Sequence, residues 1–200
     1  MKSMTGFEVY DEIPIENCSQ EDIDNALDCT WVKRRKTPHK VRCRLVARGC
    51  FQEDMDTDDT FASTPTLVTL RVLLLLSLSR CWTVLTCDIS TAFLHAPMFE
   101  RLFTRPPVEF YPESNCLWLL KRAMYGLKQA PALWQTHFAK TMISLGFHRC
   151  KTDPNLYCHS SIRNCMYCVM WMIFWYVETL NVETLSVSKF SLNNCQRRFC

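Results

Sequence analysis

Two stretches in the first quarter of the chain alternate bulky residues with basic ones. They run over Thr30–Arg35 and Val41–Arg48, and the short segment Thr37-Pro-His lies between them. Alternation with a period of two places every second side chain on the same face of a strand. The pattern therefore predicts a two-stranded hairpin with one basic face.

Helical periodicity marks two longer stretches. The first begins after Pro65 and runs from about Thr66 to Ser79, where Leu67, Leu70, Leu74 and Leu78 fall near helical spacing. The second runs from about Ala130 to Leu145, and Gly146 is its natural stop. One face of this second helix collects Leu133, Trp134, His137, Phe138, Thr141, Met142 and Leu145.

Shorter apolar runs between turn-forming residues predict strands. They cover Cys81–Cys87, which is followed directly by Asp88, then Cys116–Leu120 and Asn155–Cys158. Pro-rich Arg105–Pro112 reads as an extended loop. Helices mixed with strands in this way indicate an α/β (α+β) protein.

The charge is distributed very unevenly along the 200 residues, although the net charge is only +3. Residues 1–30 carry eight acids and one Lys, residues 31–52 carry eight Lys or Arg and no acid, and residues 53–59 carry five acids. A basic strip between acidic flanks favours a local phosphate-binding surface over a field spread across the whole protein. The length suits one domain, or one domain and a fragment of another.

The 13 cysteines show no disulfide-scaffold spacing, and no apolar leader follows Met1. We therefore expect reduced thiols in an intracellular protein, cytoplasmic or nuclear, that is not secreted. No apolar run reaches the ~20 residues that a membrane-spanning helix needs, so no membrane partner is expected. Only four glycines are present, which excludes a Gly-rich phosphate loop. The single CxxC, Cys165–Cys168, has no second ligand pair at zinc-finger spacing.

Asp88 admits two interpretations from its local sequence. A carboxylate at the end of an apolar strand, before the small residues of ISTAF, is a suitable Mg²⁺ ligand. The same carboxylate, or Ser90, is also suited to cap a short helix beginning at Thr91, and taken alone the segment favours this second interpretation.

Several longer blocks of sequence occur in a fixed order, and they favour the metal-ligand interpretation of Asp88 over the helix cap. Together they resemble the reverse transcriptase domain of copia-type LTR retrotransposons, over roughly residues 29–160. The most specific are DISTAFL at 88–94 and YGLKQAP at 125–131. The others are KVRCRLVARG at 40–49, DTFASTP at 59–65, RPP at 105–107, Trp134, LGF at 145–147 and TDPNLY at 152–157.

The resemblance implies a right-hand polymerase, of which this chain holds the fingers and part of the palm. It implies a fingers-like basic hairpin and helix at 29–84 and a partial palm at 85–160. The charge pattern sets apart an acidic N-terminal segment at 1–28, and residues 161–200 form a tail that we expect to be out of frame, for the reason given below. The resemblance also implies RNA-directed DNA synthesis with two Mg²⁺ ions, an RNA or DNA template-primer and dNTPs.

The family's functional positions map onto individual residues. Asp88 matches the first catalytic aspartate, a ligand of both Mg²⁺ ions, with the Ile89 carbonyl nearby. Phe93 matches the aromatic gate that rejects a 2′-OH, and its alternative is a plain core residue.

Three other positions concern the nucleotide and template. Arg42 and Arg44 match the hairpin that grips the triphosphate, and their alternative is a solvated strand face. Gln129 matches a residue beside the nascent base pair, with a simple turn residue as the alternative. Lys128 matches a template-phosphate contact.

The pattern breaks where the family needs a second carboxylate pair, Tyr-Val-Asp-Asp. No Asp follows Asp153, and the partial match at Tyr176–Thr179 supplies only Glu178. Met and Trp have one codon each, so residues 169–177 fix most of the underlying bases. Read from the third base of each codon, Met170–Ile173 spells Val-Asp-Asp without any codon choice, and the surrounding codons permit VLCYVDDLLV.

We therefore expect a slipped reading frame between about His159 and Cys165, which makes the tail an out-of-frame translation. A diverged in-frame tail is the rival interpretation. With two of three carboxylates lost, we expect a catalytically inactive and poorly folded reverse transcriptase fragment. A non-catalytic nucleic-acid-binding remnant that uses the basic hairpin is the alternative function, and a decayed frame without function is the third.

Overall fold

The chain folds into two compact units in a computed structural model that describes residues 2–52, 60–109, 111, 114–160, 166–170 and 173–178. We call the first the hairpin unit; it comprises Met1–Ala62 and Phe93–His137. We call the second the sheet unit; it comprises Ser63–Ala92 and Phe138–Cys200. Each unit draws on two separate stretches of sequence, so neither corresponds to one continuous segment.

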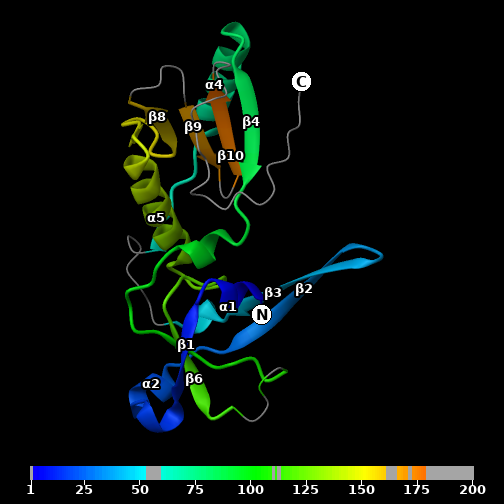
Figure 1. The fold of residues 1–200 in the computed structure, drawn as a ribbon, viewed down its shortest axis with the longest axis vertical. Coiled ribbons are helices and arrows are strands. Elements are labelled where there is room, and N and C mark those ends of the chain that lie inside the picture. Colours follow the sequence, from blue (N-terminus) through cyan, green and yellow to red (C-terminus); the bar gives the residue numbers. More distant parts are fainter. Residues whose placement is uncertain are drawn as a thin grey trace. The chain divides into compact units, whose positions relative to one another are not determined.

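The hairpin unit contains a three-stranded sheet of order β1-β6-β5 and the separate hairpin β2–β3, which extends as a long two-stranded ribbon in Figure 1. Its elements are α1 (Lys2–Gly6), β1 (Tyr10–Pro14), η1 (Ile15–Asn17), α2 (Gln20–Asp24), β2 (Cys29–Thr37), β3 (Lys40–Ala47), η2 (Gly49–Phe51), β5 (Phe103–Thr104) and β6 (Cys116–Leu120). The 3₁₀ helix η3 (Ala92–His95) lies at the boundary between the units.

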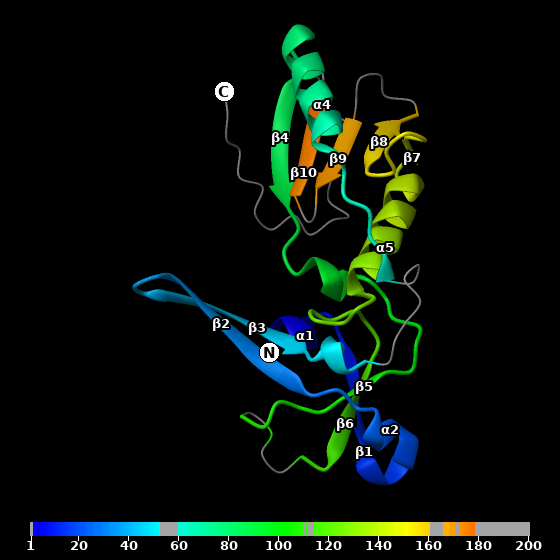
Figure 2. The ribbon, with the colours of Figure 1, turned by 180° about the vertical axis from the view of Figure 1, so that it is seen from behind.

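The sheet unit is built on five antiparallel strands in the order β4-β10-β9-β8-β7. They are β4 (Thr83–Asp88), β7 (Phe147–Arg149), β8 (Leu156–His159), β9 (Met166–Met170) and β10 (Ile173–Glu178). Helix α4 (Leu67–Ser79) lies over one face of this sheet, as Figure 2 shows. Helix α5 (Ala130–Ser144) contributes its first half to the hairpin unit and its second half to the sheet unit.

Apolar side chains hold each unit together separately. In the hairpin unit Ala26, Phe103 and Leu117 form one buried cluster. The next residue along β6, the fully buried Trp118, stacks its ring on Tyr10, with ring centroids 3.9 Å apart. In the sheet unit buried Leu73 packs with Trp82, Val84 and Leu156. These contacts remove aliphatic and aromatic surface from water, which is the main favourable term in folding.

Most of the predicted elements are confirmed, with boundaries shifted by a residue or two. The basic hairpin forms as β2–β3, the two helices form as α4 and α5, and the strand at Cys116–Leu120 forms as β6. Thr66 caps α4 by accepting a hydrogen bond from the Thr69 N–H, 3.1 Å away, and Gly146 ends α5 with φ of +88°. The mixed α+β class is also confirmed, with sheets that are antiparallel.

The N-terminal segment is more ordered than its acidic composition indicates. Strand β1 pairs along its whole length with β6, from Tyr10 opposite Leu120 to Pro14 opposite Cys116. Helix α2 begins with a complete capping box between Ser19 and Asp22. The segment is therefore an integral part of the hairpin unit.

Candidate active site

Asp88 lies at the last position of β4 and its side chain is exposed. The carboxylate has no hydrogen bond or ion pair with any residue that the structure describes, so Asp88 itself does not cap a helix there. The next residue, Ile89, is 7% exposed and turns its side chain into the core. Asp88 is thus presented to solvent at the end of β4, which is a suitable position for a metal ligand.

The strand beside Asp88 is β10, and its register decides what faces the carboxylate. Ile173 is the Cα partner of Asp88, and the pairing continues to Glu178 opposite Thr83. Glu178 therefore lies at the far end of β4 from Asp88 and does not supply the second acid. Within the described ranges, no three His, Cys, Asp or Glu side chains gather as a group that would hold a metal ion.

Arg42 and Arg44 lie exposed on β3, where Arg42 pairs with Arg34 and Arg44 pairs with Val32. Residues directly opposite in an antiparallel pair share a face, so Arg34, Arg42 and Arg44 line one side of the ribbon. The Arg44 guanidinium also lies 5.5 Å from the centroid of the Tyr125 ring. One face of the hairpin therefore carries three arginines. The other face also carries cations, because Lys33 and Arg35 pair with Cys43 and Val41, so the prediction of a single basic face is wrong.

Phe93 is half-buried beside the same tyrosine, with the two ring centroids 4.9 Å apart and the rings tilted by 58°. Arg44, Tyr125 and Phe93 thus form a basic and aromatic cluster within the hairpin unit. Sequence reasoning did not single out Tyr125, although it opens the motif YGLKQAP. Its place between a cation and an aromatic ring is a tertiary feature that local spacing does not encode.

Gln129 is 1% exposed and its amide makes two hydrogen bonds. It accepts from the Gln52 side chain at 3.0 Å and donates to the Glu100 carboxylate at 2.8 Å. The neighbouring Lys128 donates its backbone N–H to the Gln52 side-chain oxygen at 2.9 Å and its ammonium to the Gln52 carbonyl at 3.0 Å. We call these four residues the glutamine clamp, because they bind the residue after η2 to the loop before α5.

Two glycines make this clamp sterically possible. A Cβ on Gly49 would overlap the Gly126 carbonyl, and a Cβ on Gly126 would overlap the Ala47 carbonyl and the Val46 side chain. Gly126 also has φ of +95°, in the left-handed region that favours glycine. The Ala47 N–H donates to the Tyr125 carbonyl at 2.8 Å across this contact. The base of the hairpin is therefore held by main chain packed on main chain.

The motif TDPNLY has a structural role that the sequence did not reveal. The buried Asp153 carboxylate accepts hydrogen bonds from the Asn155 N–H at 2.9 Å and the Thr66 N–H at 3.4 Å. The Asn155 amide donates to the Ser63 hydroxyl at 3.1 Å. The motif thereby fastens the segment before α4 to the start of β8.

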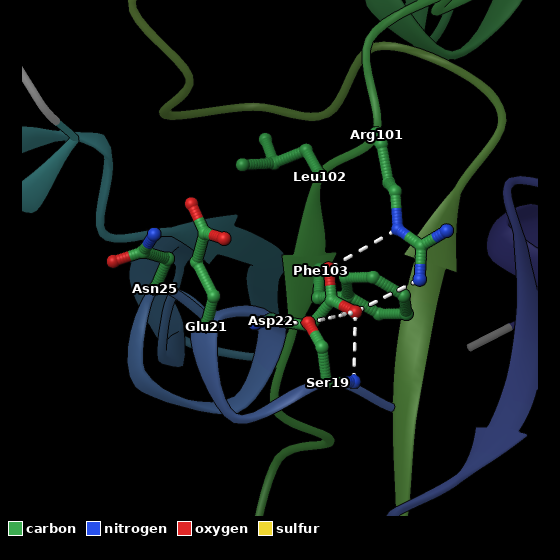
Figure 3. A pocket seen from close by; sticks show the side chains of 7 residues that line it. All are labelled: Ser19, Glu21, Asp22, Asn25, Arg101, Leu102 and Phe103. Atoms are coloured by element: carbon green, nitrogen blue, oxygen red, sulfur yellow. Dashed lines mark hydrogen bonds and ion pairs between the residues drawn. The ribbon is translucent and has the colours of Figure 1, made fainter. Parts of the chain in front are cut away.

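A second polar cluster surrounds a cavity of about 470 Å³ in the hairpin unit (Figure 3). Arg101 makes a bidentate ion pair with Asp22, at 3.1 and 2.8 Å, and Ser19 donates to the same carboxylate at 2.7 Å. The Arg101 hydrogen bond, followed by those from Ser19, lowers the pKa of Asp22 to about 2. The cavity's guanidinium and this carboxylate neutralise each other, and together they fasten α2 to the segment before β5.

The expected site residues are thus divided between the two units. Asp88 and Ile89 belong to the sheet unit, whereas Arg42, Arg44, Phe93, Lys128 and Gln129 belong to the hairpin unit. The geometry of the site is therefore defined separately for the residues of each unit.

Comparison with known proteins identifies the family. Residues 17–191 match the family of reverse transcriptases, RNA-dependent DNA polymerases. The chain belongs to this family. The match takes in most of the chain, including the β4 strand that ends at Asp88 and the β9–β10 hairpin beside it.

Individual relatives are copia-type polyproteins from plant and yeast transposons. The chain is 25% identical over 152 residues to the retrovirus-related Pol polyprotein from transposon RE1 of Arabidopsis thaliana, covering 72% of the chain. It is 30% identical over 139 residues to the corresponding polyprotein from transposon TNT 1-94 of Nicotiana tabacum, covering 66% of the chain. It is 31% identical over 136 residues to the transposon Ty1-DR4 Gag-Pol polyprotein of Saccharomyces cerevisiae, covering 67% of the chain.

The chain spans only 10% of the length of the two plant polyproteins and 8% of the yeast one. None of the helices that the structure describes is long and apolar enough to cross a membrane.

Proposed function

We propose that this reverse transcriptase domain no longer catalyses nucleotidyl transfer. The observation that carries the proposal is the pairing of Asp88 with Ile173. The family's mechanism requires further carboxylates beside the first aspartate to hold two metal ions around the primer terminus and the triphosphate. An isoleucine at the paired position supplies no oxygen ligand.

The residues present do not fit a two-magnesium site. Mg²⁺ prefers oxygen ligands in octahedral geometry, usually with at least one or two carboxylates. Among the described residues at this end of β4, Asp88 is the one acid, and the sequence supplies Trp171 and Met172 between β9 and β10. We therefore derive no catalytic step through a metal ion in this chain.

The strand boundaries support a slipped reading frame as the cause. Strand β9 ends at Met170 and β10 begins at Ile173, and the codons of Met170–Ile173 spell Val-Asp-Asp when read from their third base. A restored frame would place the two aspartates at the junction of β9 and β10, next to the pairing partner of Asp88. The match to the family runs to residue 191, so it includes this hairpin and suits a diverged in-frame tail as well.

The remaining roles carry over as part of the same proposal. Arg42 and Arg44 bind phosphate groups of the nucleotide or template, Phe93 contacts the sugar, and the Ile89 carbonyl lies near the first metal position. Gln129 and Lys128 are assigned to the template side. Their hydrogen bonds to Gln52 and Glu100 mean that in this conformation they act first as supports of the loop.

Sequencing the transcript across the codons of residues 155–185 tests the cause. We expect that adding or removing one base between the codons of His159 and Cys165 restores a reading frame that encodes Tyr-Val-Asp-Asp. This restored frame should continue without a stop codon. A stop codon directly after the motif in the shifted frame would contradict a slipped reading frame and favour a diverged in-frame tail.

Primer extension tests the loss of activity directly. The purified chain should incorporate no more dNTP with Mg²⁺ than its Asp88→Asn variant does. Mg²⁺-dependent incorporation that disappears in Asp88→Asn would overturn the proposal. Urea unfolding of the same preparation shows whether the chain is folded, because a folded domain unfolds cooperatively and a decayed frame does not.

A second function is favoured by the cationic face of the hairpin. Arg34, Arg42 and Arg44 project from one side of an exposed ribbon, an arrangement that neutralises a phosphate backbone. We therefore propose residual, sequence-independent RNA binding through β2–β3. This activity needs no carboxylate and would survive the loss of catalysis.

RNA-binding isotherms at several salt concentrations distinguish RNA binding by the hairpin from electrostatic attraction of RNA to cations elsewhere on the chain. Replacing Arg34, Arg42 and Arg44 with Gln should weaken binding and reduce the salt slope by about 0.7 for each lost phosphate contact on single-stranded RNA. The matched control replaces Arg80, Lys140 and Lys151, three exposed cations of the sheet unit, with Gln. Equal effects of the two triple variants would contradict a site on the hairpin.

A further inference from the structure

The outer part of the β2–β3 ribbon is exposed on both of its faces. Every residue from 32 to 44 is exposed, and both views show this part extending away from the other elements of the hairpin unit (Figures 1 and 2). Leu45 and Ala47, at the base of the ribbon, are buried. A sheet normally packs at least one face against a core, which the outer ribbon does not do. A ligand can therefore reach the outer ribbon from either side.

The register of the two strands divides five cations between these faces. Side chains alternate along each strand and directly paired residues share a face, so Arg34, Arg42 and Arg44 lie on one side. Lys33 and Arg35 lie on the other side. We call the first side the arginine face and the second the lysine face. On each face two of the cations are two residues apart on one strand, which separates them by about 7 Å along the ribbon.

No acidic side chain neutralises these cations within the hairpin. Residues 31–52 contain no Asp or Glu. None of the five cations makes an ion pair with a residue that the structure describes, whereas Arg101 and Arg105 of the same unit are paired with Asp22 and Asp28. Basic side chains without a carboxylate partner are suited to neutralise the phosphates of a nucleic acid. Both faces of the outer ribbon have this property.

The geometry of a two-stranded ribbon favours two ligands over one. Cations on opposite faces point away from each other, so a phosphate backbone that lies along the arginine face does not reach Lys33 or Arg35. Two phosphate backbones repel each other in free solution. Positive charges placed between them reduce that repulsion, and the ribbon is only one layer of backbone thick. One nucleic-acid segment therefore fits on each side.

We propose that the outer β2–β3 ribbon binds two nucleic-acid segments at once, one on each face, and so bridges separate RNA molecules. The proposal rests on the RNA binding proposed above and adds a second binding face to it. Bridging raises the effective concentration of one RNA near the other. Complementary RNAs held in this way should anneal faster than the same RNAs in free solution.

Energy transfer between two short, non-complementary RNAs, one carrying a donor dye and the other an acceptor dye, tests bridging by the full chain. Transfer should rise as the chain is added and fall again at excess chain, because each RNA then occupies a separate chain. Replacing either the three cations of the arginine face or the two of the lysine face with Gln should abolish the transfer. The variants are compared at chain concentrations where fluorescence anisotropy shows the same fraction of RNA bound.

Two control variants keep the test specific to the faces of the ribbon. Replacing Lys140 and Lys151, two exposed cations of the sheet unit, with Gln removes the same charge as the lysine-face variant and should leave bridging unchanged. Exchanging the cations of the lysine face, with Lys33→Arg and Arg35→Lys together, keeps both charges and should also preserve bridging. Loss of bridging in the Gln variant alone then reports the missing charge.

Three results would overturn the proposal. Energy transfer that survives replacement of Lys33 and Arg35 with Gln would show that the second face is not needed. A chain that binds RNA without energy transfer, as a single strand wrapped around the ribbon would produce, contradicts bridging but leaves RNA binding by the hairpin intact. A chain that binds no RNA contradicts both proposals.

Discussion

The two hairpins of this protein, β2–β3 and β9–β10, are held in place in different ways. The first depends on particular residues at its base, namely Gly49, Gly126 and the glutamine clamp. The second is held between two neighbours, with β9 paired to β8 and β10 paired to β4 through main-chain hydrogen bonds. Main-chain pairing does not depend on side-chain identity as the clamp does.

Under the proposed loss of catalysis, this difference would let the fold persist without its chemistry. A hairpin that pairs through its backbone can keep its place beside Asp88 whether or not it carries the family's aspartates. A hairpin that depends on two glycines and a buried amide has no such tolerance. Substitutions on the two hairpins should therefore have unequal effects.

The largest effect is expected from Gly126→Ala at the base of the first hairpin. The new methyl group would overlap the Ala47 carbonyl, and the residue would also be strained at φ of +95°. We expect a loss of about 3 kcal/mol or more in the free energy of unfolding, measured by urea denaturation. Gly6→Ala is the control, because a Cβ there meets no atom within 4 Å. Equal effects of the two variants would contradict the close approach at Gly126.

The next largest effect is expected from Gln129→Leu. Leucine keeps most of the volume but leaves the Gln52 amide and the Glu100 carboxylate without their partner, so we expect a loss of about 1–3 kcal/mol. Thr136→Ala, at an exposed position on the helix α5 that follows Gln129, should change stability by less than about 0.5 kcal/mol. If Gln129→Leu is as mild as this control, the clamp contributes little to stability.

A smaller loss of stability, which depends on whether Mg²⁺ is present, is expected from Ile173→Asp in the second hairpin. It places a carboxylate directly opposite Asp88, and such like-charge pairs cost up to about 1 kcal/mol. Millimolar Mg²⁺ should recover the lost stability in urea unfolding, because a divalent ion can bridge the two carboxylates. Val177→Asp is the control, since it pairs with Val84 and should gain nothing from Mg²⁺. A Mg²⁺ response shared by both variants would contradict the register.

The smallest effect concerns pH and the Asp22–Arg101 pair. Because the pKa of Asp22 falls from 3.8 to about 2 on folding, its contribution is fully present above pH 3.8. The contribution is lost as pH falls through about 2. NMR titration of the Asp22 carboxyl should show this low pKa, and Arg101→Gln should move it back towards 3.8. An unchanged titration in Arg101→Gln would mean that the Ser19 hydrogen bonds alone hold the pKa down.

The elements with strong local periodicity were predictable from the sequence, and those defined by distant partners were not. Alternating basic residues revealed β2–β3, and leucine spacing revealed α4. Strand β1 escaped notice because YDEIP has no apolar face of its own and is fixed by β6. Strands β9 and β10 were set aside as out-of-frame sequence, yet they pair with β8 and β4.

The candidate site was predictable in part. Asp88 and the arginines could be found from their motifs, because a strand end and an alternating strand are local features. The burial of Gln129 and the contact of Tyr125 with Arg44 and Phe93 could not, because each depends on residues far away in the chain. Spacing of α4 identified the helix but not which side is buried, since Leu67 and Leu78 are exposed while Leu73 is buried.

The close main-chain packing at Gly49 and Gly126 has a consequence for how this sequence can change among copies. Neither glycine tolerates a side chain, whether or not the copy retains polymerase activity. In copies released from selection for catalysis, aspartates and arginines are free to vary, but these two positions vary only once selection for a folded product has also ended. A substitution at either glycine in such a copy therefore indicates that the copy is no longer under selection for a folded protein.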